Sequence, residues 1–489
     1  MNWKHLKILS GPVSALLLFF IAYNNDVTTE ASLMAGIALW MAVWWMAEVV
    51  HMAITSLLPM VLLPVLGIAK AKDVSLQYMD SIIFLFIGGF IIAFAIEKWN
   101  LHKRIALMML SGVGVKPANI LLGIMLATWF ISMWISNTAT VMMMISAVYA
   151  IIKNSEEHFS DQEQFRKFSS SLLIGLAYSA TIGGMATLVG TPTNMIFYRT
   201  YQEHFKESDL MNFAEWMKIG FPVSLLMLFF CWWILKTFMI GNMRHSGVEK
   251  SFFKNQLKEL GKMSADEKIV LSVFSLVAVL WMTRSPIDFG SVQFHGWSKW
   301  FGAKSEYIND SVVAIFGALI LFLIPSSTKK EENIMSWKDA ESFPFDIILL
   351  FGGGFALALG IEQSGLSTVL AAQLEGLAGM PIIIMIAGLC LLITVISEFA
   401  SNVASIQLAL PVLMALAGPM HIHPLTLMIP ATLAASLGFM LPVATAPNTI
   451  VYGSRKIKAS EMYKAGFWVN LAGITLITLL SYLLMDYST

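Results

Sequence analysis

Two short polar clusters lie inside long apolar runs of this 489-residue chain. The first, residues 136–140, reads SNTAT, and the second, residues 401–405, reads SNVAS. In hydrocarbon every backbone polar group must be satisfied by protein, so irregular backbone survives only where it lines a cavity. If each cluster joins two half-helices, the freed carbonyls and the Ser and Asn oxygens could coordinate a hard cation. The helix N-termini and the amide and hydroxyl donors beside them could face an anion.

The composition indicates the solvent in which these clusters must work. Hydrophobic residues make up 57% of the chain and charged residues only 13%, against about 25% charged residues in a soluble protein. The mean hydropathy of +0.72 agrees, so we expect an all-α polytopic membrane protein. The net charge of zero offers no basic surface for a nucleic acid. Cys231 and Cys390 both lie in apolar runs, which is typical of small core residues rather than of a disulfide or a metal site.

Two apolar runs, 119–152 and 381–416, are too long for one membrane helix and are interrupted by the polar clusters. We interpret both as re-entrant hairpins that return to the side from which they enter. A crossing helix needs about 20 apolar residues, fewer if it is discontinuous, and about eleven further runs satisfy this requirement. They are 8–23, 31–49, 53–68, 81–96, 170–198, 220–240, 269–282, 311–324, 347–361, 425–452 and 467–485.

The distribution of basic residues supports this arrangement. With the N-terminus in the cytoplasm and the C-terminus outside, most of the 31 lysines and arginines fall in cytoplasmic segments, as the positive-inside rule requires. If both hairpins crossed the bilayer fully, the loops between them would change sides and the bias would be lost.

An internal repeat relates the two clusters. The stretch FIGGFIIAFAIEKWNL from Phe86 and the stretch FGGGFALALGIEQSGL from Phe351 are identical at half of their positions. The same interval relates Ser132 to Ser397 and Asn137 to Asn402. A looser pair, GGMATLVGTPTN (183–194) and FMLPVATAPN (439–448), places small residues and a proline in the middle of an apolar run. An odd number of crossings separates the two copies, so the second is inverted, an architecture frequent in secondary transporters.

The repeat divides the chain into five expected parts. Residues 1–80 form N-terminal scaffold helices, and residues 81–240 form the first repeat with its hairpin at 119–152. Residues 241–268 form a cytoplasmic connector, and residues 269–345 form further scaffold helices. Residues 346–489 form the second repeat, with its hairpin at 381–416 and the last helix.

Other interpretations of the clusters were weighed. Ser, Thr and Asn in membrane helices often bond neighbouring backbone or hold helices together, but two related copies in two overlong runs favour a binding site. An intramembrane hydrolase would need a base within reach of Ser136 or Ser401. Neither hairpin contains a histidine, and Glu398, three residues before Ser401, would serve one copy only; it could instead tune cation or proton coupling. A passive channel would conduct without saturation or cation coupling.

The motifs resemble those of a known family, the divalent-anion:sodium symporters. The resemblance covers nearly the whole chain and rests on SNTAT at Ser136, SNVAS at Ser401, IGGMATLVGTPTN from Ile182 and LPVATAPNTIVYGS from Leu441. It implies an elevator-type homodimer in a bacterial cell membrane that uses sodium as the coupling ion. The expected function is sodium-coupled import of a small divalent anion, with a C4-dicarboxylate such as succinate as the leading substrate. A dicarboxylate exchanger and a sulfate or citrate symporter of the same fold are the alternatives.

The resemblance also implies residue roles. One sodium site would use Ser132, Ser136, Asn137 and Gly190, and the other would use Ser397, Ala400, Asn402 and Ala444. The anion would be contacted by Asn137, Thr138, Thr191, Pro192, Asn402, Val403 and Thr445. One departure from the family pattern is Val403, which places a methyl group where a second SNT motif would have a hydroxyl.

Overall fold

A computed structural model describes residues 3–159, 161–205, 211–243, 245–249, 251–288, 293–329, 331–341, 343–374, 380–418, 420 and 422–484. These residues are almost entirely helical, as the composition predicts. The first half holds α1 (Trp3–Asn24), α2 (Thr29–Ala47), α3 (Met52–Thr55), α4 (Leu58–Val65), α5 (Ala71–Gln77), α6 (Ser81–Lys98), α7 (Leu101–Val113), α8 (Pro117–Ser132), α9 (Asn137–Glu156), α10 (Gln162–Gly184), α11 (Pro192–His204), α12 (Phe213–Leu235) and the π-helix η1 (Lys236–Ile240).

The second half holds α13 (Phe252–Glu259), α14 (Ala265–Thr283), η2 (Trp297–Tyr307), α15 (Asp310–Leu323), α16 (Trp337–Ala340), α17 (Phe345–Gln363), α18 (Leu366–Leu374), α19 (Ile382–Phe399), α20 (Asn402–Ala417), α21 (Leu425–Ala435), α22 (Ala446–Tyr452) and α23 (Ala459–Leu484). Two strands of two residues each, β1 (Ile287–Asp288) and β2 (Gln293–Phe294), pair antiparallel before η2.

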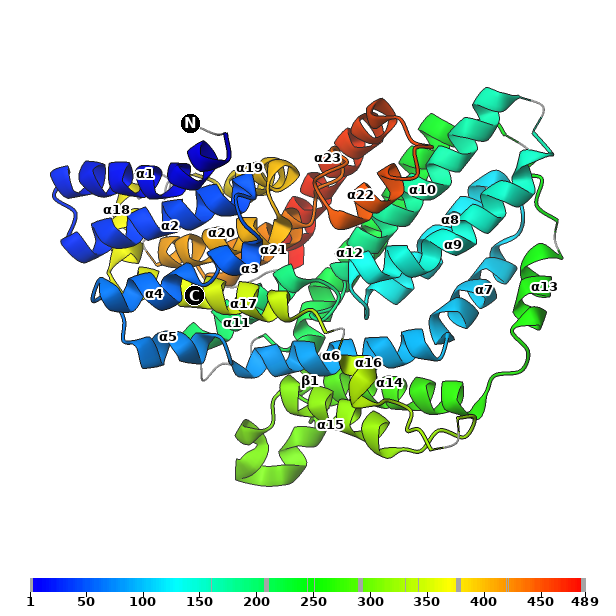
Figure 1. Ribbon diagram of the computed structural model, residues 1–489, viewed down its shortest axis with the longest axis horizontal. Coiled ribbons are helices and arrows are strands. Elements are labelled where there is room, and N and C mark those ends of the chain that lie inside the picture. The colour runs from blue at the N-terminus through cyan, green and yellow to red at the C-terminus, as the bar shows by residue number, and fades with distance from the viewer. Residues whose placement is uncertain are drawn as a thin grey trace.

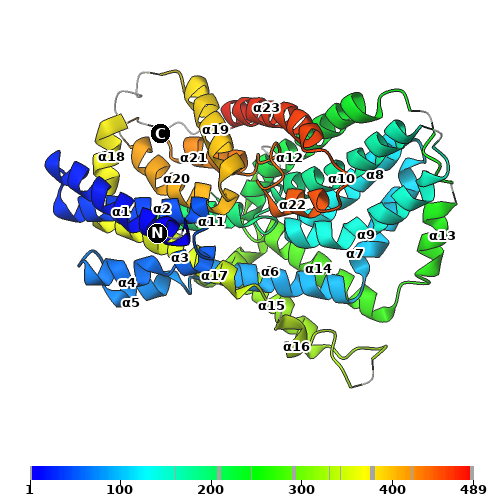
Figure 2. The ribbon, with the colours of Figure 1, turned by 45° about the horizontal axis from the view of Figure 1, so that its top comes forward.

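Both polar clusters stand where one helix ends and the next begins. Residues 133–136 join α8 to α9, and residues 400–401 join α19 to α20. Within each pair the two helices pack on each other. In Figures 1 and 2 the pair α8–α9 lies in the right half of the molecule and the pair α19–α20 in the left half. The two clusters therefore approach the middle of the molecule from opposite sides.

Two of the expected crossing runs are broken in the middle, at the proline-containing motif of each half. The run 170–198 is divided into α10 and α11 by residues 185–191, and the run 425–452 is divided into α21 and α22 by residues 436–445. Pro192 and Pro447 stand in the first turn of α11 and α22. Proline has no N–H to donate to the preceding turn, so it is well suited to the first turn of a helix, where no such hydrogen bond is made.

Seven of the described helices are long and apolar enough to cross a membrane unbroken. One of the seven is α19, the first arm of the second expected hairpin. Of the expected crossings outside the seven, the run 53–68 is divided into α3 and α4, the run 311–324 forms the 14-residue α15, and the run 269–282 lies in α14, a helix of 19 residues with charged residues in its first turn. Close packing holds the helices together: a methyl group added at Gly88 of α6 would lie 2.5 Å from the backbone of Ala314 in α15. Such small-residue contacts are typical of helix pairs in membranes.

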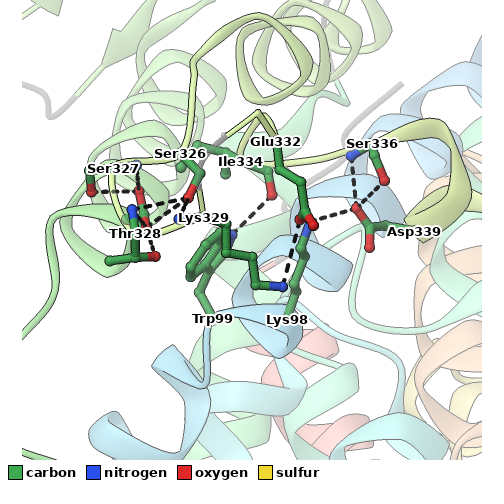
Figure 3. A network of polar contacts seen from close by, with 11 residues as sticks. Lys98, Trp99, Ser326, Ser327, Thr328, Lys329, Glu332, Ile334, Ser336 and Asp339 are labelled. Carbon is green, nitrogen blue, oxygen red and sulfur yellow. Dashed lines mark hydrogen bonds and ion pairs between the residues drawn. The ribbon is translucent and has the colours of Figure 1, made fainter.

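Polar contacts fasten the segment between α15 and α17 to the end of α6 (Figure 3). Lys98 Nζ lies 2.7 Å from Asp339 Oδ2, and the Trp99 indole donates to Ile334 O at 3.0 Å. Asp266, in the first turn of α14, accepts hydrogen bonds from the turn at 326–328. Burial raises the pKa of Asp266, but these hydrogen bonds outweigh it and lower the pKa to about 2, so the carboxylate remains an acceptor at neutral pH.

Candidate functional site

One cavity, of about 980 Å³, lies where the two hairpin tips (133–136 and 400–401) meet the two breaks at 185–191 and 436–445. Most of the residues expected at the site line it: Ser136, Asn137, Thr138, Thr191, Pro192, Ala400, Asn402, Val403, Ala444 and Thr445. Ser132, Gly190 and Ser397 are buried just outside the lining. Residues more than 300 positions apart in the sequence thus share one site.

The first helix break gathers backbone and side-chain oxygens around Asn137. Ser132 Oγ lies 2.8 Å from Asn137 Oδ1. A methyl group added at Gly190 would lie 2.6 Å from Gly184 O and 3.0 Å from Met133 O. One added at Gly184 would collide with Asn137 Oδ1. Because only hydrogen fits at these two positions, glycine is required for the oxygens to come this close.

A hydroxyl contact closes the first break. The Thr187 hydroxyl donates to Met133 O at the end of α8, and the Gly190 N–H donates to Thr187 Oγ1 at 3.1 Å. Thr187 is fully buried. The contact joins the break at 185–191 to the tip of the first hairpin without any charged group.

The second helix break has the same plan with different contacts. Ser397 Oγ lies 2.9 Å from Asn402 Oδ1 and 2.6 Å from Ala435 O. One hydroxyl proton can serve only one of these two acceptors. The remaining lone pairs face one another, and a bound cation would relieve their repulsion. Crowding is lower here, since a methyl group at Gly438 would lie 3.5 Å from Asn402 Oδ1.

Two buried asparagines hold the broken helices in matching ways, and the sequence analysis did not select them. The Asn194 amide donates to Gly184 O at 3.0 Å and to Thr187 O at 2.8 Å. The Asn448 amide donates to Gly438 O at 3.0 Å and to Leu441 O at 3.1 Å. The signal was present, because each asparagine is the last residue of the proline-containing motif in its half.

The chemistry of the cavity is that of neutral oxygens and donors. Of its described lining residues none is Lys, Arg or His, and Glu48 is the one carboxylate. Among the described residues no group of three His, Cys, Asp or Glu side chains comes together. Neutral oxygens are ligands for hard cations. A doubly charged anion in this cavity would meet amide, hydroxyl and helix N-terminal donors, but no basic side chain to balance its charge.

The remaining lining is apolar. It includes Phe90 and Phe94 from α6, Met142 from α9, Phe399 from α19, and Val443. An apolar lining with a few polar groups at fixed positions is typical of small-molecule sites.

The comparisons with known proteins agree with this picture. Residues 2–485 match the family described as the sodium:sulfate symporter transmembrane region. Relatives named sodium-dependent dicarboxylate transporter SdcS, from Staphylococcus saprophyticus and Staphylococcus aureus, are each 39% identical over 98% of this chain and 91% of their own length.

Two solved transporter structures share the fold at low identity. Neisseria gonorrhoeae MtrF, whose structure is described as illuminating a class of antimetabolite efflux pumps, has a TM-score of 0.56 and 11% identity over 83% of both chains. The Alcanivorax borkumensis YdaH transporter has a TM-score of 0.53 and 10% identity over 85% of this chain and 89% of its own. The full-length match and the high identity to SdcS lead to the conclusion that this chain is a member of the sodium:sulfate symporter family of membrane proteins.

Proposed function

We propose that the protein is a sodium-coupled symporter that imports a small divalent anion, a C4-dicarboxylate such as succinate. The observation that carries the proposal is a cavity between two oxygen-rich helix breaks whose described lining has no basic side chain. A doubly charged anion is costly to desolvate without compensating charge, and cations bound beside it would supply that charge. The SdcS relatives are named sodium-dependent dicarboxylate transporters, which supports both sodium and the dicarboxylate.

In this proposal each break holds one sodium ion. The first ion would be held by Ser132, Ser136, Asn137 and Gly190, and the second by Ser397, Ala400, Asn402 and Ala444. The anion would lie between them, contacted by Asn137, Thr138, Thr191, Pro192, Asn402, Val403 and Thr445. The close approach of Ser132 Oγ to Asn137 Oδ1, at 2.8 Å, and of Ser397 Oγ to Asn402 Oδ1, at 2.9 Å, supports this assignment.

The arrangement in the membrane belongs to the same proposal. About eleven crossings, two re-entrant hairpins and an inverted repeat would place the N-terminus in the cytoplasm of a bacterial cell and the C-terminus outside. The protein would work as a homodimer in which the cavity-bearing part moves as an elevator. The excess of basic residues in the expected cytoplasmic loops and the bacterial origin of the SdcS relatives support this arrangement.

Uptake by purified protein in proteoliposomes tests the proposal. An inward sodium gradient should drive accumulation of labelled succinate, and replacing sodium with potassium or choline should abolish it. A dicarboxylate exchanger would instead require succinate or a similar anion inside the vesicles and would ignore the sodium gradient. That second result would overturn sodium coupling.

Competition assays test the substrate class. Unlabelled succinate, citrate and sulfate would each be added against labelled succinate at a saturating sodium concentration. Succinate should compete best because its two carboxylates can reach both helix breaks at once. Stronger competition by sulfate or citrate would replace the dicarboxylate with that anion.

A further inference from the structure

Glu398 is a buried carboxylate at the end of α19, next to Ser397, and only 4% of its surface is exposed. Its Oε1 accepts from the Met440 N–H at 2.8 Å and from the Asn470 side-chain amide at 2.6 Å. Its Oε2 accepts from the Leu441 N–H at 3.0 Å. Three donors around two oxygens suit an ionised carboxylate, which can only accept.

The first half joins the same two positions without a charge. The interval that relates Ser132 to Ser397 places Met133 opposite Glu398, and the interval that relates Asn194 to Asn448 places Thr187 opposite Leu441. In the first half the Thr187 hydroxyl donates to Met133 O. In the second half a carboxylate accepts from the Leu441 amide instead. One contact between hairpin and helix break is thus neutral in one half and anionic in the other.

Satisfying the backbone does not by itself explain the charge. The break at 436–445 is longer than the break at 185–191, and its exposed amides need acceptors because lipid supplies none. A neutral acceptor would meet this need, as it does in the first half. A buried carboxylate also carries a desolvation cost unless a positive charge lies near it. The described residues provide Glu398 with no ion pair to Lys, Arg or His.

A sodium ion bound by the oxygens around Ser397 would supply that positive charge. Asn402 Oδ1 and Ala435 O both lie within 3 Å of Ser397 Oγ. Ser397 is the residue directly before Glu398 in α19. The segment that Glu398 holds at Met440 and Leu441 leads directly to Ala444 in the cavity lining. Glu398 is therefore linked to the proposed second sodium site twice, through its chain neighbour Ser397 and through the segment that leads to Ala444.

We propose that Glu398 is a positioning residue of the second sodium site, raising its affinity for sodium by its negative charge and fixing the backbone that carries Ala444. This inference rests on the sodium coupling proposed above. It makes the two sodium sites unequal: the second, with the carboxylate beside it, fills at a lower sodium concentration than the first.

Three variants separate the charge from the mechanical contact. Glu398→Gln keeps the size of the side chain and removes the charge, whereas Glu398→Asp keeps the charge on a shorter side chain. The double variant Glu398→Met with Leu441→Thr copies the neutral contact of the first half. Glu156→Gln, an exposed carboxylate at the end of α9, is the matched control for loss of one negative charge.

Two measurements are made on each purified variant: the sodium concentration for half-maximal succinate uptake, and the rise in melting temperature that sodium causes without the anion. Glu398→Gln and the double variant should need about ten-fold more sodium in both assays, because a nearby charge in a medium of intermediate dielectric is worth at least that much. Glu398→Asp should recover most of the loss. The KM for succinate at saturating sodium should stay close to that of the wild type.

The outcomes are distinct. If the double variant binds sodium as the wild type does, Glu398 is only a backbone contact and the inference is wrong. If the double variant does not fold, the comparison of Glu398→Gln with Glu398→Asp tests the role of the charge. If these two variants bind sodium with the same affinity, the inference is wrong. Absence of any sodium dependence in the wild type would instead refute the proposed coupling and leave the hydrogen bonds of Glu398 a matter of folding.

Discussion

The two helix breaks that meet at the cavity are built on one plan, yet they differ in how tightly they are closed. Around the first, a methyl group at Gly190 would lie 2.6 Å from a carbonyl oxygen, whereas the second carries Ala444 at the corresponding position. The first is joined to its hairpin by the neutral hydroxyl of Thr187, and the second by the carboxylate of Glu398. In the proposed function, crowded oxygens at the first break and a nearby charge at the second are two physical routes to one task, the binding of a weakly held cation.

The anion-facing side differs as well. The first tip presents Thr138 to the cavity and the second presents Val403. A hydroxyl can donate to a carboxylate and a methyl group cannot, so a dicarboxylate would be held more firmly at its first end. This difference teaches that a duplicated site need not be a symmetric one, and each prediction below tests one part of the asymmetry.

The largest effect is expected from the asparagines that the two tips share. Asn137→Ala and Asn402→Ala each remove an oxygen that lies within 3 Å of a serine hydroxyl and an amide donor beside the cavity. Each should reduce sodium-driven uptake to the background of empty liposomes while the protein stays folded. Uptake and melting temperature are measured together, because only a folded protein without transport supports the site.

A matched control for these variants is Asn119→Ala. Asn119 lies near the start of α8, at the opposite end of this helix from the first tip, and its amide donates to Val113 O. Its loss should leave uptake nearly unchanged. Normal uptake by both tip variants would refute the proposed site, whereas a large loss in only one of them would show that a single tip binds the anion.

The next effect concerns crowding, and it contrasts two corresponding glycines. Gly184→Ala would push a methyl group into Asn137 Oδ1 and within 3.0 Å of Gly190 O, whereas Gly438→Ala would meet its nearest neighbour at 3.3 Å. The methyl group of Gly184→Ala would displace the Asn137 amide from the site and press on the Gly190 carbonyl, so we expect a loss of about 1–3 kcal/mol in stability and a large loss of uptake. The second variant should lose less than about 1 kcal/mol and keep most of its uptake.

Thermal melting and sodium titration of the two variants check this contrast. Similar losses in both would mean that the breaks are equally crowded, and the comparison between them would fail. A loss in Gly438→Ala alone would reverse it.

The sequence alone was enough to predict the helical breaks and the meeting of most site residues, because the repeat made two weak motifs into one strong pattern. The pairing of Asn137 with Asn402 across the cavity follows from the inverted copies. The apolar stripe that identifies the buried face of a soluble helix is absent here, because helices in lipid can be apolar on every face.

What the sequence did not predict lies in the irregular backbone. The contacts of Thr187 with Met133 and of Glu398 with Met440 and Leu441 depend on the path of the chain through residues 185–191 and 436–445. Helix and strand propensities say nothing about that path, because the residues there are in neither state. A carboxylate at membrane depth such as Glu398 suggests a functional role, but only the structure reveals that its partners are two backbone amides and the side chain of Asn470.

The smallest effect is expected at Thr138 and Val403, where the two tips differ by a hydroxyl in place of a methyl group. Val403→Thr adds a hydroxyl of nearly the same shape to the second tip, and Thr138→Val removes one from the first. A hydrogen bond to a charged group contributes about 1.5–3 kcal/mol at best and less when partly solvated, so Val403→Thr should lower the KM for succinate about three- to ten-fold with little change in kcat. Thr138→Val should raise KM by at least as much.

The measurement is uptake at saturating sodium over a range of succinate concentrations, with melting temperature as the control for folding. The added hydroxyl should favour succinate over sulfate, because succinate carries two separate carboxylates that can each face one tip. An unchanged KM in Val403→Thr, together with a raised KM in Thr138→Val, would mean that the anion binds at the first tip and that the second serves sodium alone.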